Sequence, residues 1–244
     1  LTTLSATGVI SDDRFGYAVA ISGDAIAVSA EGDDDNGVNS GSVYLFSRNE
    51  GSADNWGQTA HISPTDIAAV DFFGVDVAID GDTLVVGSYD DDDACPWNPN
   101  CNSGAAYVFR RNAGGADNWG QAAKITATDS ITYDQFGGSV AIDGDVIAIG
   151  AAYNDPSPVL TNTGAVYVFA RNEGGADNWG QTAKLTTRDG RPEDHFGNSV
   201  VVDRDIVFVG AWYFDDVGGN SGLSFIYRER LFDAYLPVAI RNHP

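Results

Sequence analysis

Methionine is absent from the sequence, lysine occurs only at Lys124 and Lys184, and no segment approaches the ~20 consecutive apolar residues of a membrane-spanning helix. The missing initiator methionine indicates a processed or truncated chain, and we expect no membrane span. No window keeps the apolar period of an amphipathic helix. Catalytic signatures such as G-x-S-x-G, H-E-x-x-H, a phosphate-binding loop and G-x-G-x-x-G are also missing. These absences favour an all-β protein without enzymatic activity.

Basic residues are scarce: 13 Lys and Arg stand against 35 Asp and Glu, which gives a net charge of −22. Such a chain repels nucleic acid and anionic membranes and attracts cations. Aspartate supplies 30 of the 35 acidic residues. Its short side chain suits turns and oxygen-rich cation loops, whereas solvated helix faces usually carry Glu and Lys. We therefore expect no nucleic-acid partner.

Cysteine occurs twice, at Cys95 and Cys101 in the segment CPWNPNC. Two thiols are too few ligands for a metal site, and no histidine lies near them in the sequence. A spacer that contains two prolines can close a small loop, so we expect a Cys95–Cys101 disulfide. Such a bridge points to an oxidising compartment, and we expect the protein outside the cell or at its surface.

One pattern occurs four times along the chain. Each copy opens with a phenylalanine-glycine pair, at DRFG (13–16), DFFG (71–74), DQFG (134–137) and DHFG (194–197). An alternating run that ends in SGD, DGD or DRD follows, then a short apolar run, an acidic loop and a run such as GAVYVF. The first three copies continue through ADNWGQ, at 53–58, 116–121 and 176–181.

These runs are short, rich in Val, Ile, Tyr and Phe, and bounded by Gly, Asp and Asn, which predicts β-strands. The SGD and DGD segments predict two-residue hairpin turns. Each copy is then a four-stranded antiparallel meander, and such units bury their faces against neighbouring copies. The predicted fold is an all-β propeller of four four-stranded blades over residues 1–230, with repeats beginning near 13, 71, 134 and 194 and an extended tail at 231–244.

The repeat also predicts how the blades pack. Each tryptophan of ADNWGQ begins a fourth strand, where a large aromatic can cover the gap to the next blade. We expect packing between blades for Trp56, Trp119, Trp179, Phe15, Phe73, Phe136 and Phe196. The fourth copy lacks ADNWGQ, while LTTLSATG at 1–8 matches KLTTRDG at 184–190, the end of a fourth strand. The N-terminal strand is therefore expected to complete the last blade and close the ring, which leaves no open edge.

The segments DQFG, SVAIDGD, IAIGA and GAVYVF between 134 and 169 resemble the FG-GAP repeat, which also builds the propellers of integrin α-chains. The resemblance extends from about Asp13 to Tyr227 and implies a secreted, bacterial-type member. Integrin-type members have more blades, so the resemblance implies either a small ring or several chains in a larger assembly. Members that bind calcium carry a DxDxDG-type loop between the first two strands. Here that loop is only DGD or SGD, so the family's calcium site is not carried over.

Consecutive carboxylates in the acidic loops repel each other unless a cation neutralises them. Ca²⁺ prefers ~6–8 oxygen ligands in a flexible loop, and we expect calcium there. The expected ligands are Asp33, Asp34, Asp35, Asp90, Asp91, Asp92 and Asp93, with Asp13 and Asp71. For the acidic loops, the alternative is a set of solvated Asx turns without an ion. For the four aspartates before FG, which include Asp134 and Asp194, the alternative is hydrogen bonding to backbone amides. The histidines His61, His195 and His243 are scattered without metal-ligand spacing.

The C-terminal segment LFDAYLPVAI has no place in a ring closed by the N-terminus. Its apolar residues are Leu231, Phe232, Tyr235, Leu236, Val238 and Ile240. We expect them to bind a neighbouring chain in a homo-oligomer or filament, by adding a strand to it. A strap across the rim of the same propeller is the alternative. Trp97 and Trp212 stand outside the repeat positions and are candidates for contacting a glycan or protein ligand.

The function that these features predict is an extracellular structural or adhesive propeller, which binds calcium and self-associates into a surface layer, sheath or filament. One alternative is a monomeric binding module that recognises glycans or cell-surface proteins. A propeller domain of a larger secreted enzyme is another.

Overall fold

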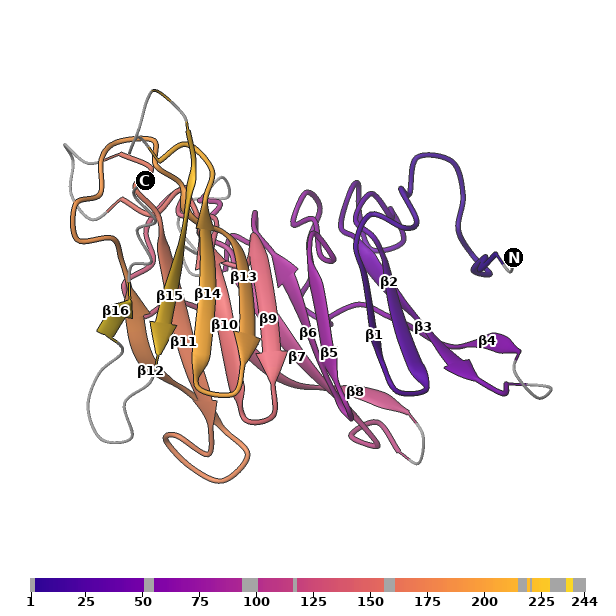
Figure 1. The fold of residues 1–244 in the computed structure, drawn as a ribbon. Coiled ribbons are helices and arrows are strands. Elements are labelled where there is room, and N and C mark those ends of the chain that lie inside the picture. The colour runs from indigo at the N-terminus through magenta and orange to yellow at the C-terminus, as the bar shows by residue number, and fades with distance from the viewer. Residues whose placement is uncertain are drawn as a thin grey trace.

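The computed structural model describes residues 3–50, 55–93, 101–115, 118–155, 161–214, 219 and 221–228, together with the backbone of 236–238. All regular secondary structure in these ranges is β-strand. The strands form four separate four-stranded sheets, each an antiparallel meander of consecutive strands. The sheets follow one another in sequence order (Figure 1). The predicted architecture of four four-stranded blades is therefore confirmed.

Blade 1 consists of β1 (Val19–Ser22), β2 (Ala25–Ala30), β3 (Ser42–Arg48) and β4 (Trp56–Ile62). Blade 2 consists of β5 (Val77–Asp80), β6 (Thr83–Ser88), β7 (Ala105–Arg111) and β8 (Trp119–Ile125). Blade 3 consists of β9 (Ser139–Asp143), β10 (Val146–Ala151), β11 (Ala165–Arg171) and β12 (Trp179–Leu185). Blade 4 consists of β13 (Phe196–Asp203), β14 (Ile206–Ala211), β15 (Leu223–Arg228) and β16 (Leu236–Val238).

A two-residue turn joins the first two strands of every blade, as the sequence predicts. The first turn residue has a positive φ, with 56° at Gly23, 53° at Gly81, 56° at Gly144 and 55° at Arg204. In blades 1 to 3 the residue before the turn also accepts a hydrogen bond from the following blade. In one example the Gly144 amide donates to Asp80 Oδ2 at 2.7 Å. The aspartate that opens the DGD turn therefore ties neighbouring blades together.

A close backbone contact joins each blade to the next. Gly41, Gly104 and Gly164 precede the third strands of blades 1 to 3, with φ between +81° and +83°. A Cβ on any of these glycines would lie 2.0 Å from the carbonyl oxygen of the next blade's phenylalanine: Phe73, Phe136 or Phe196. The phenylalanine amide donates across the same joint, as from Phe136 to the Ser103 carbonyl at 3.0 Å. Only glycine fits the position, because it needs both the left-handed φ and the missing side chain.

Aromatic side chains fill the space between neighbouring blades. Phe73, Phe136 and Phe196 are fully buried, and Trp119 and Trp179 are buried with them. Phe73 and Trp119 of blade 2 share a core cluster with residues of blade 1. Trp119 and Trp179 therefore cover the gap to the preceding blade, whereas the sequence analysis placed the tryptophans on the gap to the next. The strand register explains why the side chain points to the preceding blade. Trp119 pairs with Arg111, so its side chain lies on the same face of the sheet as Phe109, which packs against blade 1. Trp56 and Phe15 belong to blade 1 and pack on its own cluster around Tyr44, not between two blades.

The outer strand of the last blade comes from the C-terminal segment. β16 pairs antiparallel with β15, with Leu236 opposite Arg228 and Val238 opposite Ile226. The N-terminal segment instead packs on blade 1, where Leu4 contacts the cluster built on Tyr44. The prediction that the N-terminal strand completes the last blade is therefore wrong. The other tail residues assigned to partner binding, Leu231, Phe232, Tyr235 and Ile240, lie outside the described residues.

The physical reason is that the four blades form an open arc. Core clusters join blade 1 to blade 2, blade 2 to blade 3 and blade 3 to blade 4. The described residues of blades 1 and 4 share no such cluster, and the N-terminal segment from residue 3 and β16 lie at opposite ends of the arc (Figure 1). The N-terminal segment therefore does not reach β15, and the nearby C-terminal segment pairs with that strand.

The joint at Gly104 gives a testable prediction. Gly104→Ala forces a Cβ against the Phe136 carbonyl oxygen and a side chain into a left-handed φ. We expect a loss of about 3 kcal/mol or more in the free energy of unfolding, measured by urea denaturation. Gly144→Asn is the matched control, since Gly144 has open space around it and blade 4 carries Arg204 at the same turn position. Equal stability of the two variants would contradict the proposed joint.

Candidate functional site

Each of blades 1 to 3 carries a buried polar group in the loop after its second strand, named here the loop site of that blade. The group is Asp33 in blade 1, Asp91 in blade 2 and Asn154 in blade 3, each no more than 2% exposed. A tyrosine of the third strand and a basic residue of the fourth strand pair beside it: Tyr44 with His61, Tyr107 with Lys124, and Tyr167 with Lys184. One arrangement is thus built three times with different residues.

In the loop site of blade 2, a lysine ammonium binds three carboxylates. Lys124 Nζ lies 2.9 Å from Asp91 Oδ2, 2.5 Å from Asp93 Oδ2 and 3.2 Å from Asp66 Oδ2. The same nitrogen lies 5.1 Å from the centre of the Tyr107 ring, whose hydroxyl donates to Asp91 Oδ2 at 2.7 Å. Burial lowers the pKa of Lys124, but the bonds to Asp91 and Asp93 outweigh it and hold that pKa above its usual value. The acidic loop therefore has a cation of its own.

Blade 3 keeps the lysine but moves its carboxylate partner. Asn154 replaces the buried aspartate and donates through Nδ2 to Asp134 Oδ2 at 2.9 Å. Lys184 Nζ binds Asp129 Oδ2 at 2.6 Å, and the Tyr167 hydroxyl donates to Asp129 Oδ1 at 2.9 Å. Burial raises the pKa of Asp129, but the hydrogen bonds from Lys184 and Tyr167 outweigh it and hold that pKa below its usual value.

In the described residues of blade 4, apolar side chains stand at the corresponding place. Phe214 stands where the other blades carry Asp33, Asp91 or Asn154, and Phe225 stands where they carry tyrosine. The two phenylalanine rings meet edge to face, with their centres 5.4 Å apart. Both members of the polar pair are therefore replaced together by apolar residues in blade 4.

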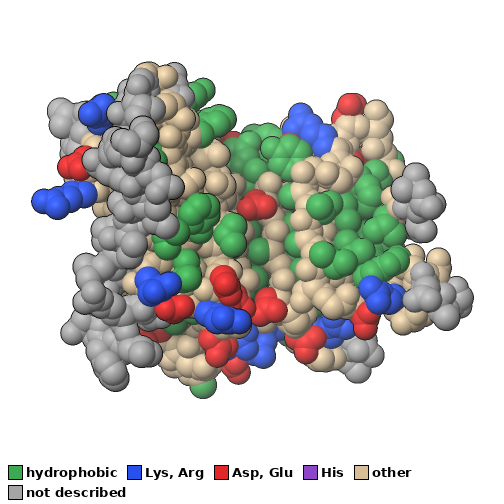
Figure 2. All heavy atoms as spheres, in the orientation of Figure 1, with side chains coloured by type: hydrophobic (Ala, Val, Ile, Leu, Met, Phe, Trp, Pro, Cys, Tyr) green, Lys and Arg blue, Asp and Glu red, His purple; other side chains and the backbone are tan. Residues whose placement is uncertain are grey.

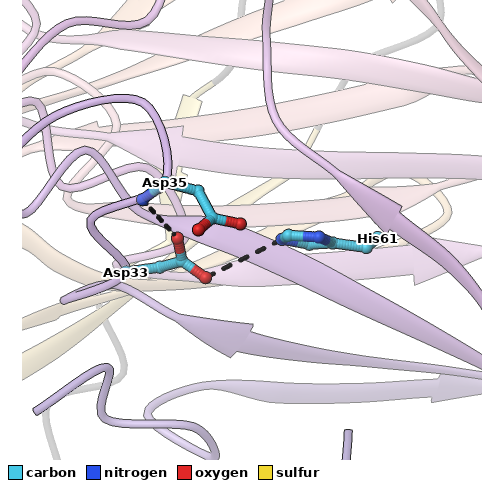
Figure 3. A group of neighbouring side chains, drawn as sticks. All are labelled: Asp33, Asp35 and His61. Carbon is cyan, nitrogen blue, oxygen red and sulfur yellow. Dashed lines mark hydrogen bonds and ion pairs between the residues drawn. The ribbon is translucent and has the colours of Figure 1, made fainter. Parts of the chain in front are cut away.

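The loop site of blade 1 holds a histidine instead of lysine. Asp33 Oδ2 accepts hydrogen bonds from the Ser42 hydroxyl at 2.8 Å and the Tyr44 hydroxyl at 3.0 Å. The His61 ring stacks on the Tyr44 ring, with 4.3 Å between centres and 2° between planes. His61 Nε2 lies 3.7 Å from Asp33 Oδ2, and Figure 3 shows Asp35 beside both. Among the described residues, Asp33, Asp35 and His61 are the group of three that lies close enough to hold a metal ion.

Three other predicted calcium ligands accept hydrogen bonds from their own loops or from the next blade. The Asn39 amide donates to Asp34 Oδ1 at 2.7 Å, and the Asn102 amide donates to Asp92 Oδ1 at 2.6 Å. Asp90 Oδ1 accepts from Gln135 Nε2 at 3.2 Å. The two-residue turns between the first strands leave no loop that could encircle an ion, so the residues present do not fit the calcium site of the related repeats. Calcium at the acidic loops stays a prediction.

The four aspartates before FG share one backbone role. Asp13, Asp71, Asp134 and Asp194 are buried, and each accepts a hydrogen bond from the amide three residues earlier, at 2.6, 2.7, 3.0 and 2.6 Å. These bonds fix the turn that leads into each blade. Burial raises the pKa of Asp71 to about 7, against the opposing effect of the Ala68 amide. The carboxylates therefore serve as turn anchors in this geometry.

Two further sequence assignments have mixed outcomes. Cys101 is buried and no described cysteine is free, but Cys95 and Trp97 lie outside the described residues, so the Cys95–Cys101 bridge stays a prediction.

Trp212 is exposed and stacks on Tyr213. It lines a groove of about 380 Å³ together with Tyr17, Tyr89 and Tyr153, so all four blades contribute to that groove.

The sequence pattern of the FG-GAP repeat matches residues 2–46, 56–109, 119–169 and 179–227. The chain belongs to the FG-GAP repeat family. Three of the four matches begin at the tryptophan of one fourth strand and end in the third strand of the next blade. The FG-GAP unit is thus offset from the blade by one strand, and the first match includes the N-terminal segment that packs on blade 1.

Solved structures support the fold of this FG-GAP protein. The crystal structure of the computationally designed Ika4 protein superposes with a TM-score of 0.50 at 11% identity, over 93% of this chain and 98% of that chain. No curated protein matches the sequence. In the part of the chain that the structure describes, no helix has the length and apolar character needed to cross a membrane.

The lysine of blade 2 gives a prediction about stability. Lys124→Met leaves the buried Asp91 carboxylate without its cation, and we expect a loss of about 3 kcal/mol in the free energy of unfolding. Adding Asp91→Asn should recover part of that loss. Lys184→Met is the control and should cost less, since Asp129 is half exposed. Equal losses for the two lysine variants in urea unfolding would contradict the role given to the buried carboxylate.

The raised pKa of Asp71 gives a prediction about pH. The folded state holds the Asp71 proton up to about pH 7, whereas the unfolded chain releases it near the ordinary value of 3.8. Ionisation therefore costs stability as the pH rises between these values. Asp71→Asn keeps an acceptor for the Ala68 amide and should raise the melting temperature at pH 8 but not at pH 4. Exposed Asp12→Asn is the control, and a pH-independent effect of Asp71→Asn would refute this assignment.

Proposed function

We propose that this FG-GAP protein is a non-enzymatic structural module that associates with further copies of itself through the two ends of its blade arc. The first end face is the uncovered side of blade 1, with Val19 and Ile21 67% and 63% exposed. The last end face is the uncovered side of blade 4, with Val201 and Phe208 57% and 42% exposed. Figure 2 shows hydrophobic side chains on the surface over both end sheets.

The repeat itself indicates what covers these faces. Val77 and Ile79 of blade 2 occupy the positions of Val19 and Ile21, and they are buried against blade 1. Ala141 and Ala148 of blade 3 occupy the positions of Val201 and Phe208, and they are buried against blade 4. Inside the chain, a face equivalent to the first end face therefore always packs on a face equivalent to the last end face of the preceding blade.

A second copy is the occupant that this complementarity favours. The last end face of one copy meets the first end face of another, just as one blade meets the next. Such a contact is head-to-tail, so it either closes a ring of copies or continues into a filament. Exposed apolar surface of this kind is a liability for a free monomer, which adds support. An extracellular location remains part of the proposal, and the expected Cys95–Cys101 bridge supports it.

Paired end-face variants test the proposal. Val19→Glu with Ile21→Glu blocks the first end face, and Val201→Glu with Phe208→Glu blocks the last. We expect each double variant to be monomeric by light scattering at physiological salt, because the carboxylates cannot be buried in the contact. An equimolar mixture should stop at a dimer, since one intact face remains on each partner.

The control is Val38→Glu, which replaces an exposed apolar residue away from both end faces and should leave the assembly unchanged. A monomeric wild-type protein, or variants that still form assemblies of wild-type size, would refute association through the end faces. Failure of the mixture to dimerise would refute the head-to-tail geometry.

A second candidate function is ligand binding, and the groove lined by Tyr17, Tyr89, Tyr153 and Trp212 favours it. Exposed aromatic rings with polar neighbours suit a ligand that is apolar on one face and polar at its edges, such as a glycan. This function predicts that Trp212→Ala abolishes glycan binding while the melting temperature and the mass in solution stay unchanged.

A further inference from the structure

We propose that Asp33, Asp35 and His61 bind a divalent cation of the zinc class at the loop site of blade 1. One ligand atom from each residue can be chosen so that all three lie within 4.8 Å of one another. Asp33 and Asp35 come from the loop after β2, and His61 comes from β4 (Figure 3). This inference does not depend on self-association.

The same chain holds a cation at the equivalent place in blade 2. There Asp91 and Asp93, the counterparts of Asp33 and Asp35, both bind the Lys124 ammonium. In blade 1 the lysine position is His61, whose Nε2 at 3.7 Å is too far from Asp33 for a hydrogen bond. Asp33 thus keeps the geometry of a carboxylate that faces a cation, while the side chain that supplies the cation in blade 2 is replaced by a metal ligand.

The surroundings of blade 1 also leave room for an ion. In blade 2 a third carboxylate, Asp66, binds the lysine. The corresponding residue in blade 1 is Gly8, which has no side chain, and a Cβ there would only approach the Tyr44 hydroxyl, at 3.7 Å. The space next to His61 is therefore open on the side where blade 2 places its third acid.

The ligand set selects the class of metal. An imidazole nitrogen with two carboxylate oxygens is a donor set of zinc and similar divalent ions, whereas calcium takes oxygen ligands. Asp33 is buried and held by Ser42 and Tyr44, an outer layer of the kind that fixes metal ligands. Asp35 and His61 are exposed, so they can adjust onto the ion and solvent can deliver it.

Chelator-treated protein titrated with Co²⁺ and Zn²⁺ tests the site, with calorimetry for affinity and visible absorption for cobalt coordination. His61→Lys copies blade 2 and keeps a cation for Asp33, so it should fold normally and bind at least roughly tenfold more weakly. Asp35→Asn removes an exposed ligand and should weaken binding similarly. Asp34→Asn, a neighbouring exposed carboxylate outside the group, is the matched control and should bind like the wild type.

The reciprocal exchange provides a gain of function. Lys124→His places an imidazole beside Asp91 and Asp93 and should add a second cobalt site to the folded protein. Unchanged zinc affinity in both His61→Lys and Asp35→Asn would overturn the inference. It would also be overturned if Ca²⁺ displaced Co²⁺ at equal concentration, since the loop would then bind through oxygen alone. A folded Lys124→His protein without a second site would refute the equivalence of the two loop sites.

Discussion

The contact between the backbone of one blade and the glycine before the third strand of its neighbour is the constraint on which the arrangement depends. At Gly104 the Phe136 carbonyl oxygen occupies the space of a Cβ, and the Phe136 amide bonds the Ser103 carbonyl. This joint sets how closely neighbouring sheets stack, and the phenylalanine ring then fills the gap beside it. The FG pair and the distant glycine are therefore two halves of one contact, repeated at each of the three blade boundaries.

Close stacking has an electrostatic consequence at the loop after each second strand. The stacked sheets bury the side chain three residues after the end of that strand, and a buried carboxylate needs a partner. The chain uses a different solution in every blade: a histidine beside Asp33, the Lys124 ammonium beside Asp91, an amide at Asn154 and a pair of phenylalanines in blade 4. The acidic composition is thus distributed between solvated positions and a few buried ones with specific partners.

The sequence predicts the strands, the turns and the number of blades, because each is local in a repeat: the short apolar runs, the DGD turn and the FG pair recur in register. The partner of the N-terminal segment is not local. The match between LTTLSATG and KLTTRDG identifies the end of a fourth strand, but it does not say whether the arc closes. His61 was missed because Asp33 and Asp35 lie far from it in the sequence. An alignment of the four copies would have placed His61 in the column of Lys124 and Lys184.

The joint between blades also explains why the arc has two unlike ends. The contact is directional, because one blade contributes the glycine and the next contributes the phenylalanine, and nothing in it limits the number of blades to four. Cutting such a stack leaves one surface that has lost its preceding blade and another that has lost its following blade. The N-terminal segment covers part of the first surface, as Leu4 packs beside Tyr44, yet Val19 and Ile21 remain exposed beyond it. The segment therefore takes the place of a neighbour's outer strand only, and the inner part of the face still has the shape and polarity that a complete blade would cover.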